Sequence, residues 1–223
     1  MNRGALAVLV IGAGLAGAVG YAWFSARESQ PVVATPASSP AASAPEAPAA
    51  RLVDTVPEFQ LADREGQLRS LTHWQGKSLV INFWATWCAP CRREIPLLQQ
   101  IARDHRAEGV EVIGIAVDFR DAVLQYADEM KIDYPLLIGE QDALDAAAAF
   151  GIEAIGFPFT IFTDQQGRII VAHMGELTAP EADLILKAVA AVNAGRESPA
   201  EARRAIEAAL PALQQESDGK SAG

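Results

Sequence analysis

The sequence contains little cysteine and little histidine. Its only two cysteines, Cys88 and Cys91, lie three positions apart in a chain of 223 residues. A single close pair excludes a fold held together by several disulfides. The three histidines, His73, His105 and His173, are scattered and lack the spacing of metal ligands. We therefore predict no metal site and no disulfide scaffold.

Basic residues are also scarce. The chain has 18 Lys and Arg against 28 Asp and Glu, which gives a net charge of −10. Nucleic acid and anionic lipid are bound mainly by clustered Lys and Arg, so neither is expected as the main partner. We interpret the acidic surface as a source of solubility. Hydrophobic residues make up 50% of the chain, which is sufficient for a packed core.

The chain begins with a long apolar run. Residues 4–26 carry no charged side chain, Arg3 precedes them, and aromatic residues occur near their end. Roughly 20 apolar residues in a helix cross a bilayer, and aromatic residues favour its interface. We predict that residues 1–27 form a single transmembrane anchor in the inner membrane, with the rest of the chain in the periplasm. The alternative is a signal peptide cleaved near Gly20-Tyr21-Ala22, which would also export the chain.

The same run contains a glycine pattern typical of dinucleotide-binding proteins. Gly12, Gly14 and Gly17 match G-x-G-x-x-G. That pattern binds a pyrophosphate only where a strand precedes it and a helix and second strand follow. Here it opens the chain and runs into a proline-rich segment, so we do not interpret it as a nucleotide site. Glycine is also common in membrane helices.

Three further segments follow the apolar run. Residues 28–51 are rich in Pro, Ala and Ser, cannot bury a core and are predicted to form an extended linker. Residues 52–195 have the hydrophobic pattern of one α/β domain. Residues 196–223 form a tail with a good helix start at Ser198-Pro199. The tail is helical or flexible in this interpretation, and we favour a loosely attached helix over a docked one.

Short apolar segments alternate with helical ones within residues 52–195. The run Ser78 to Ala85 is almost wholly apolar, which is typical of a central strand buried on both faces. The other expected strands are residues 58–61, 67–71, 110–117, 136–138, 159–162 and 168–173. The expected helices are residues 90–106, 122–130, 144–150 and 181–193. This order predicts a mixed sheet flanked by helices.

Cys88 and Cys91 lie where the central strand gives way to a helix. Pro90 suits the first turn of that helix, so Cys88 is expected at its N-terminus. Free backbone N–H groups and the helix dipole favour a thiolate there, and Arg92 and Arg93 add positive charge. Cys88 is then the attacking nucleophile, and Cys91 resolves the mixed disulfide. A purely structural disulfide is disfavoured because so small a loop constrains the unfolded chain little.

Two tryptophans adjoin the cysteines in the sequence. Trp84 and Trp87 are expected to form an apolar collar around the pair, with Trp87 contacting the substrate. Ordinary core packing is an equally good interpretation of Trp84.

The segment Ile81 to Pro96 (INFWATWCAPCRREIP) resembles the active-site segment of the thioredoxin-like TlpA/ResA/CcmG family. Members are exported, membrane-anchored thiol–disulfide reductases, and the resemblance extends over about Leu52 to Asn193. It implies a thioredoxin-like fold and protein thiols or disulfides as substrates. It also implies a membrane thiol relay as electron donor, and no cofactor beyond the redox-active disulfide.

The resemblance also assigns roles to individual residues. Pro158, within Gly156 to Thr160, matches the family's cis-proline beside the cysteines, and Phe157 would offer backbone groups to the substrate. Asn82 stands where thioredoxin has a buried acid, and Glu94 matches the glutamate that takes over acid/base catalysis. An exposed glutamate paired with an arginine is the alternative for Glu94. A further match, Pro96, implies a kinked active-site helix.

The sequence thus predicts a reductase of protein disulfides on the periplasmic side of the membrane, with cytochrome c maturation as the setting that the family implies. A disulfide-donating oxidase ranks second, because Ala89-Pro90 lacks the histidine typical of strongly oxidising relatives. A non-catalytic copper carrier is a third possibility, although the Met or His clustering that would favour it is missing.

Overall fold

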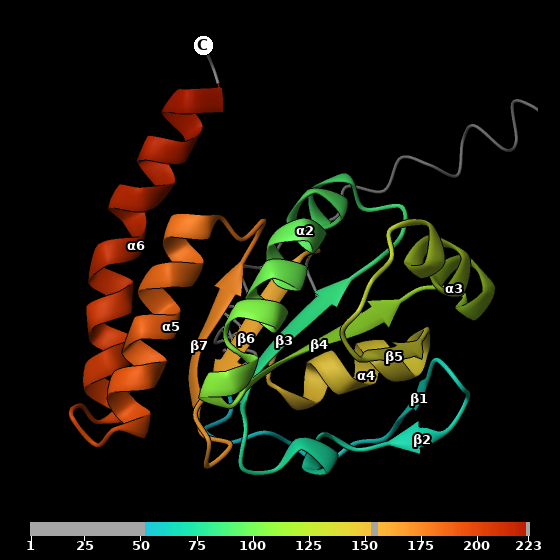
Figure 1. Ribbon diagram of the computed structural model, residues 1–223, viewed down its shortest axis with the longest axis horizontal. Helices are drawn as coiled ribbons and strands as arrows, with labels where there is room; N and C mark the ends of the chain where they lie inside the picture. Colours follow the sequence, from blue (N-terminus) through green and yellow to red (C-terminus); the bar gives the residue numbers. More distant parts are fainter. Residues whose placement is uncertain (1–51, 153–155, 222–223) are drawn as a thin grey trace, which may run out of the picture. The chain divides into compact units, whose positions relative to one another are not determined.

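Figure 1 shows a computed structural model that describes residues 52–152 and 156–221, with side chains described as far as residue 215. The predicted anchor, residues 1–27, and the predicted linker, residues 28–51, lie outside the described residues. Among the described residues, none of the helices has both the length and the apolar character needed to cross a bilayer.

The strands form one mixed sheet in the order β2-β1-β5-β4-β3-β6-β7. β3, β4 and β5 are parallel, whereas β1, β6 and β7 join the sheet antiparallel. This is the predicted thioredoxin-like mixed sheet. The strands are β1 (Leu61–Asp63), β2 (Leu68–Arg69), β3 (Ser78–Trp84), β4 (Val110–Val117), β5 (Leu136–Gly139), β6 (Phe159–Thr163) and β7 (Ile169–Met174).

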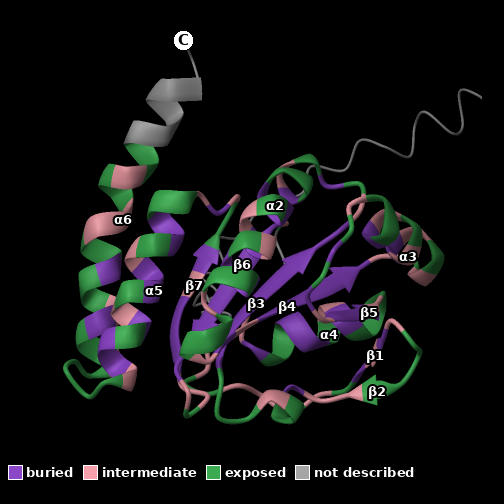
Figure 2. Ribbon diagram, in the orientation of Figure 1, coloured by how far each residue is buried: buried purple, intermediate pink, exposed green. Residues whose placement is uncertain are grey.

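Helices cover both faces of the sheet. Buried residues of α2, α3 and α5 belong to one apolar cluster, and those of α4 belong to a second cluster with apolar residues of the segment 52–59. Figure 2 shows the central strands as buried and the helices as a mixture of buried and exposed residues. The helices are α2 (Ala89–Asp104), α3 (Arg120–Glu129), α4 (Gln141–Ala149), α5 (Ala179–Asn193) and α6 (Pro199–Ser221), with short 3-10 turns η1 (Leu71–Trp74) and η2 (Arg106–Glu108).

Strand β3 separates the two clusters. Successive side chains of a strand point to opposite faces, so Val80 and Trp84 join the α2 side while Ile81 and Phe83 join the α4 side. Every residue of the strand is buried. The prediction of a central strand buried on both faces is confirmed, and the Asn82 side chain of β3 reaches Glu94 of α2.

The first hairpin is shorter than the sequence suggested. Strands were expected at residues 58–61 and 67–71, but the pairing involves only Leu61–Asp63 and Leu68–Arg69. The second strand ends after Arg69 because Ser70 is the N-cap of η1, and its Oγ accepts the N–H of Thr72 at 3.3 Å. At the other end of the hairpin, Oδ1 of Asp63 accepts the N–H groups of Glu65 and Gln67 at 3.0 and 2.8 Å and fixes the tight turn.

Helix α6 docks on the sheet edge, which corrects the expectation of a loosely attached tail. Ala202 and Ile206 are fully buried against α5 and β7. The Arg203 guanidinium donates to the carbonyl oxygens of Ile170 and Ile169 at 3.0 and 2.9 Å. β7 is the last strand of the sheet, so these bonds satisfy carbonyls that an open edge would leave exposed.

Docking of α6 predicts a stability cost for truncating its buried side chain. Ile206→Ala should lower the unfolding free energy by about 2–5 kcal/mol, because it removes buried methylenes and leaves a cavity. Urea denaturation measures this, with Glu207→Ala, on the exposed side of the same helix, as the control. If both substitutions lowered the unfolding free energy by the same small amount, the docking of α6 would not contribute to stability.

Candidate active site

The cysteine pair lies at the junction of β3 and α2, as predicted. Cys88 is the N-cap of α2, and Pro90 falls in the first turn. The two sulfurs form a disulfide, with the Cα atoms 5.3 Å apart. The N–H of Cys91 donates to the Sγ of Cys88 at 3.3 Å. On reduction this N–H and the helix dipole are in place to stabilise a Cys88 thiolate.

The two cysteines differ in exposure. Cys88 retains 5% of its accessible surface, whereas Cys91 retains none. A substrate disulfide therefore reaches Cys88 first, which fits the predicted roles of nucleophile for Cys88 and resolving thiol for Cys91.

A contact that the sequence did not reveal holds the loop before Cys88. The backbone N–H of Thr86 donates to Oδ2 of Asp118 at 3.1 Å, and the Thr86 hydroxyl donates to the same oxygen. Asp118 directly follows β4, the parallel neighbour of β3. The carboxyl ends of adjacent parallel strands meet at one edge, so an acid just after β4 was the available signal.

An apolar rim surrounds Cys88. Trp87 is 69% exposed, and its ring meets that of Phe157 edge-on with centroids 6.1 Å apart. The Phe157–Pro158 peptide bond is cis, as the family resemblance implied. Trp87 also lines a shallow pocket of about 360 Å³ together with Phe119 and Leu144, among others. Trp87 is exposed beside Cys88, as a collar requires, whereas Trp84 is fully buried, which fits the interpretation of ordinary core packing.

Glu94 is buried beneath the active-site helix, with 2% of its surface accessible. Its Oε1 accepts from Nδ2 of Asn82 at 2.7 Å, and its Oε2 accepts from the N–H of Leu177 at 2.8 Å. Burial raises the pKa of Glu94 to about 7, against the opposing effect of these two hydrogen bonds. The alternative of an exposed, arginine-paired glutamate is wrong for Glu94.

The arginine-paired glutamate is a different residue. Arg93, one position before Glu94, forms an ion pair with Glu176 from the segment before α5. Glu176 also raises the pKa of Glu94 slightly through its negative charge. Arg93 thus faces the solvent, whereas the adjacent Glu94 faces the core.

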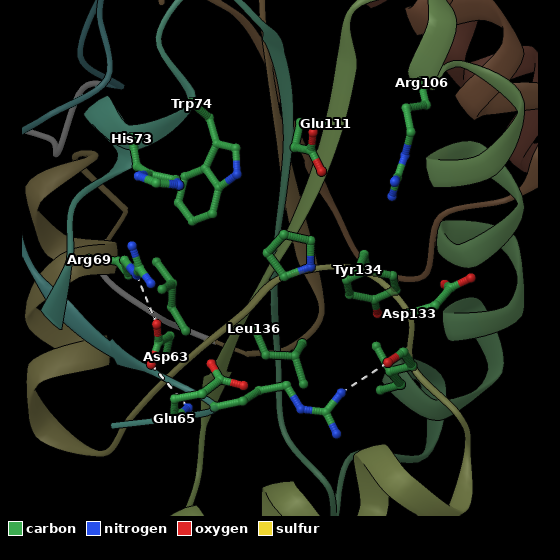
Figure 3. Close-up of a pocket in the computed structure, with 14 residues that line it drawn as sticks. Asp63, Glu65, Arg69, His73, Trp74, Arg106, Glu111, Asp133, Tyr134 and Leu136 are labelled. Carbon is green, nitrogen blue, oxygen red and sulfur yellow. Dashed lines mark hydrogen bonds and ion pairs between the residues drawn. The ribbon is translucent and has the colours of Figure 1, made fainter. Parts of the chain in front are cut away.

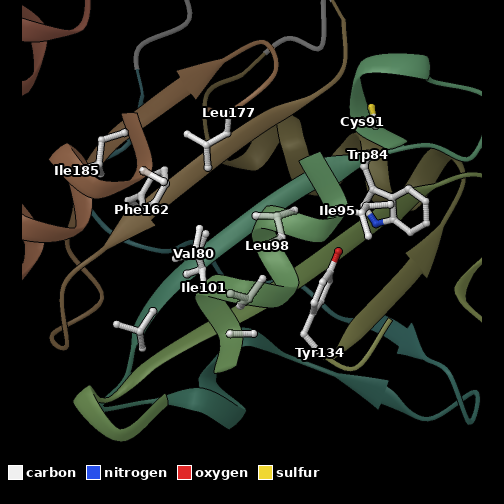
Figure 4. Packing of buried hydrophobic residues seen from close by; sticks show 14 of the residues in the cluster. Val80, Trp84, Cys91, Ile95, Leu98, Ile101, Tyr134, Phe162, Leu177 and Ile185 are labelled. Carbon is white, nitrogen blue, oxygen red and sulfur yellow. The ribbon is translucent and has the colours of Figure 1, made fainter. Parts of the chain in front are cut away.

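The surroundings of Cys91 are otherwise apolar. Figure 4 shows Trp84, Ile95 and Leu98 packed in the cluster below it, with Tyr134 from the segment before β5. Pro96 lies inside α2, as expected. Burial raises the pKa of the Tyr134 hydroxyl far above its ordinary value, so this side chain stays neutral. Within the described structure, Glu94 is therefore the group near Cys91 suited to exchange a proton near neutral pH.

A second pocket is separate from this site. It has a volume of about 490 Å³ and lies near the start of β4 and β5, away from the ends that approach Cys88 (Figure 3). Arginines and acids share its lining, and Arg69 is already paired with Asp63 at 2.8 Å. Cys88, Cys91 and Glu94 do not line it, and Tyr134 is the residue that it shares with the surroundings of Cys91.

Comparison with known proteins gives concordant matches. The AhpC/TSA family matches residues 52–172. The thiol-disulfide oxidoreductase ResA of Geobacillus thermodenitrificans is 32% identical over 125 residues, covering 56% of this chain and 70% of ResA. The thioredoxin-like protein YneN of Bacillus subtilis is 33% identical over 131 residues, covering 56% and 72%.

A solved structure agrees. The thiol:disulfide interchange protein of the thioredoxin family from Chlorobium tepidum superposes with a TM-score of 0.55 at 28% identity, covering 63% of this chain and 97% of that protein. The ResA match confirms the resemblance drawn from Ile81 to Pro96.

The raised pKa of Glu94 predicts a pH-dependent stability. The folded value of about 7 exceeds the ordinary 4.5, so the contribution of Glu94 to stability is fully present below pH 4.5 and lost as pH rises through 7. Glu94→Gln cannot ionise and escapes this loss. From about pH 4 to about pH 8 the variant should gain about 3 kcal/mol relative to the unmodified protein. Urea denaturation of the oxidised protein across pH measures this.

The control for that series is Glu207→Gln, because Glu207 is exposed on α6. Its difference from the unmodified protein should stay constant with pH. A pH-independent difference for Glu94→Gln as well would contradict a raised pKa at Glu94.

Proposed function

This chain belongs to the AhpC/TSA family, and we propose that it reduces disulfides of exported proteins in the periplasm. It is a thioredoxin-like thiol–disulfide oxidoreductase of the protein-disulfide reductase class. The observation that carries the mechanism is the pairing of Cys88 at a helix N-terminus with the buried Cys91 and Glu94.

The reaction begins at Cys88. Its thiolate attacks one sulfur of the substrate disulfide, the substrate S–S bond breaks, and the other substrate sulfur leaves as a thiolate. A mixed disulfide now joins Cys88 to the substrate. The N–H of Cys91, which contacts the Cys88 sulfur, stabilises the negative charge before the attack.

Cys91 completes the exchange. Glu94 takes the proton of the Cys91 thiol, and the new thiolate attacks the Cys88 sulfur. The bond to the substrate breaks, the substrate leaves with both sulfurs reduced, and the enzyme keeps the Cys88–Cys91 disulfide. A dithiol donor then returns two electrons. We propose a membrane thiol–disulfide relay for this donor.

Substrate binding is assigned to Trp87, Phe157 and Pro158. Trp87 is the exposed aromatic side chain next to Cys88, and Phe157 contacts it across the rim. The cis bond before Pro158 turns the chain just ahead of β6. We propose that the backbone of Phe157 pairs with an extended substrate segment beside its cystine.

The location and setting of the reaction are also proposals. The uncharged run of residues 4–26 supports an inner-membrane anchor, and the proline-rich residues 28–51 support a linker that holds the domain off the membrane. The family resemblance supports apocytochrome c as the substrate, whose cysteines must be reduced before haem attachment.

Replacing the resolving cysteine should trap the substrate. Cys91→Ser keeps Cys88 and cannot complete the second exchange, so proteins should accumulate in disulfide linkage to Cys88. Affinity purification of the variant under non-reducing conditions and mass spectrometry identify them. Cys88→Ser is the matched control and should capture none. Equal capture by the two variants would contradict the assigned roles.

Turnover of a disulfide substrate distinguishes a reductase from an oxidase and from a copper carrier. The full chain with excess dithiol should reduce insulin disulfides, and Cys88→Ser should abolish this activity. An oxidase would instead oxidise reduced substrate proteins faster than it reduces insulin. Tight Cu(I) binding without insulin turnover would favour a copper carrier.

Topology is tested in intact cells. In spheroplasts, external protease should digest the domain while a cytoplasmic marker survives, and the domain should sediment with membranes. Deleting residues 1–27 should abolish export. A protected domain in intact spheroplasts would contradict the periplasmic location.

A further inference from the structure

A short row of polar side chains crosses the sheet face beneath α2. Asn82 on β3 is the register partner of Thr160 on β6, and Thr160 is the partner of His173 on β7. All three are buried, with exposures of 0%, 0% and 3%. Nδ2 of Asn82 donates to Oγ1 of Thr160 at 3.0 Å as well as to Glu94. The residues that hold Glu94 thus belong to two different strands.

The Asn82 amide is incompletely satisfied. Its Nδ2 has two acceptors, but its Oδ1 is buried and has no hydrogen-bond partner in the described part of the chain. A buried carbonyl oxygen without a donor is unfavourable, and native proteins rarely keep one without a reason. The orientation seen here suits an ionised Glu94, because a carboxylate only accepts hydrogen bonds.

A protonated Glu94 needs the opposite arrangement. Its Oε2 faces the N–H of Leu177, which is a donor, so the acid proton belongs on Oε1, which faces Asn82. Turning the Asn82 amide about its last side-chain bond places Oδ1 where Nδ2 was, since the two ends have nearly the same shape. Oδ1 has two lone pairs and then accepts from the Glu94 carboxyl and from the Thr160 hydroxyl, which both donates and accepts.

We propose that Asn82 and Thr160 form a reversible cradle that hydrogen-bonds Glu94 in both its ionised and its protonated state, and that they are positioning residues for proton exchange with Cys91. This inference rests on the proposed function, in which Glu94 takes the Cys91 proton. The transfer converts a thiol and a carboxylate into a thiolate and a carboxylic acid and moves no electrons. The amide turns with the proton, and the reverse transfer accompanies reduction by the donor dithiol.

The other ionisable groups around Glu94 do not hydrogen-bond its carboxyl group in the described structure. Glu176 carries like charge and is held by Arg93. Tyr134 is buried and neutral. At the far end of the polar row, Nε2 of His173 lies 3.1 Å from Oε1 of Glu181, whose other oxygen accepts from Thr178 at the start of α5. Asn82 is the side chain that donates a hydrogen bond to Glu94.

Infrared difference spectroscopy tests the cradle directly. Spectra of the unmodified full chain and of the Glu94→Gln variant are recorded across pH. The difference between the two series isolates the C=O band of protonated Glu94. In Asn82→Leu this band should move to higher wavenumber, because the acid loses its acceptor. A band that stays in place would overturn the cradle, since Asn82 would then serve only the ionised state.

Kinetics supply the second readout. The rate of mixed-disulfide resolution is measured in single turnovers across pH. Its plateau value should fall about tenfold in Thr160→Val and recover in Thr160→Ser, which keeps the hydroxyl. Thr163→Val is the matched control, because Thr163 is also buried on β6 but bonds to Leu79 and Asp164. It should retain the profile of the unmodified protein. Equal losses in Thr160→Val and Thr163→Val would reduce Thr160 to a structural role and overturn the cradle.

The outcomes distinguish this inference from the function on which it rests. If Glu94→Gln leaves the pH profile unchanged, Glu94 is not the proton acceptor and the proposed mechanism fails. If Glu94→Gln flattens the profile while the Asn82 and Thr160 variants behave as the unmodified protein does, only the cradle fails.

Discussion

A carboxyl group inside an apolar core must be hydrogen-bonded, protonated or both, and Glu94 meets this requirement with groups from two distant parts of the chain. The amide of Asn82 reaches it from β3, and the N–H of Leu177 reaches it from the segment before α5. These bonds tie the active-site helix to the sheet at the turn that follows Cys91. The position of the resolving thiol and the protonation of its neighbour therefore depend on the same contacts.

The central part of the fold could be predicted because burial imposes a simple pattern there. The residues of β3 and β4 form nearly continuous apolar runs, and the structure reproduces those bounds closely. The periphery could not be predicted in the same way. The second strand of the first hairpin ends where Ser70 caps η1, and α6 docks through Arg203 and the carbonyls of an edge strand. Such contacts join residues that periodicity treats as independent.

The active site shows the same division. The placement of Cys88 followed from a strand, a proline and a helix start, all of which are local signals. The burial of Glu94 did not, because the residues alone also allowed an exposed glutamate paired with an arginine, and the family resemblance was what assigned Glu94 to acid/base catalysis. The partners of the site, Asp118 and Thr160, come from β4 and β6, and strand register decides their neighbours. Register is a property of the assembled sheet, which a single sequence does not state.

In the proposed mechanism, two different physical effects form the two thiolates within one helical turn. Cys88, at the helix N-terminus, is stabilised by the backbone N–H of Cys91 and by the helix dipole, so it needs no base. Cys91 contributes that N–H but is itself wholly buried, and burial opposes its ionisation. A buried thiol can react only if a nearby group takes its proton without water, and Glu94 titrates near neutral pH because it shares the same burial. In the proposed mechanism, the exclusion of solvent that protects Cys91 thus also raises the pKa of its base, Glu94.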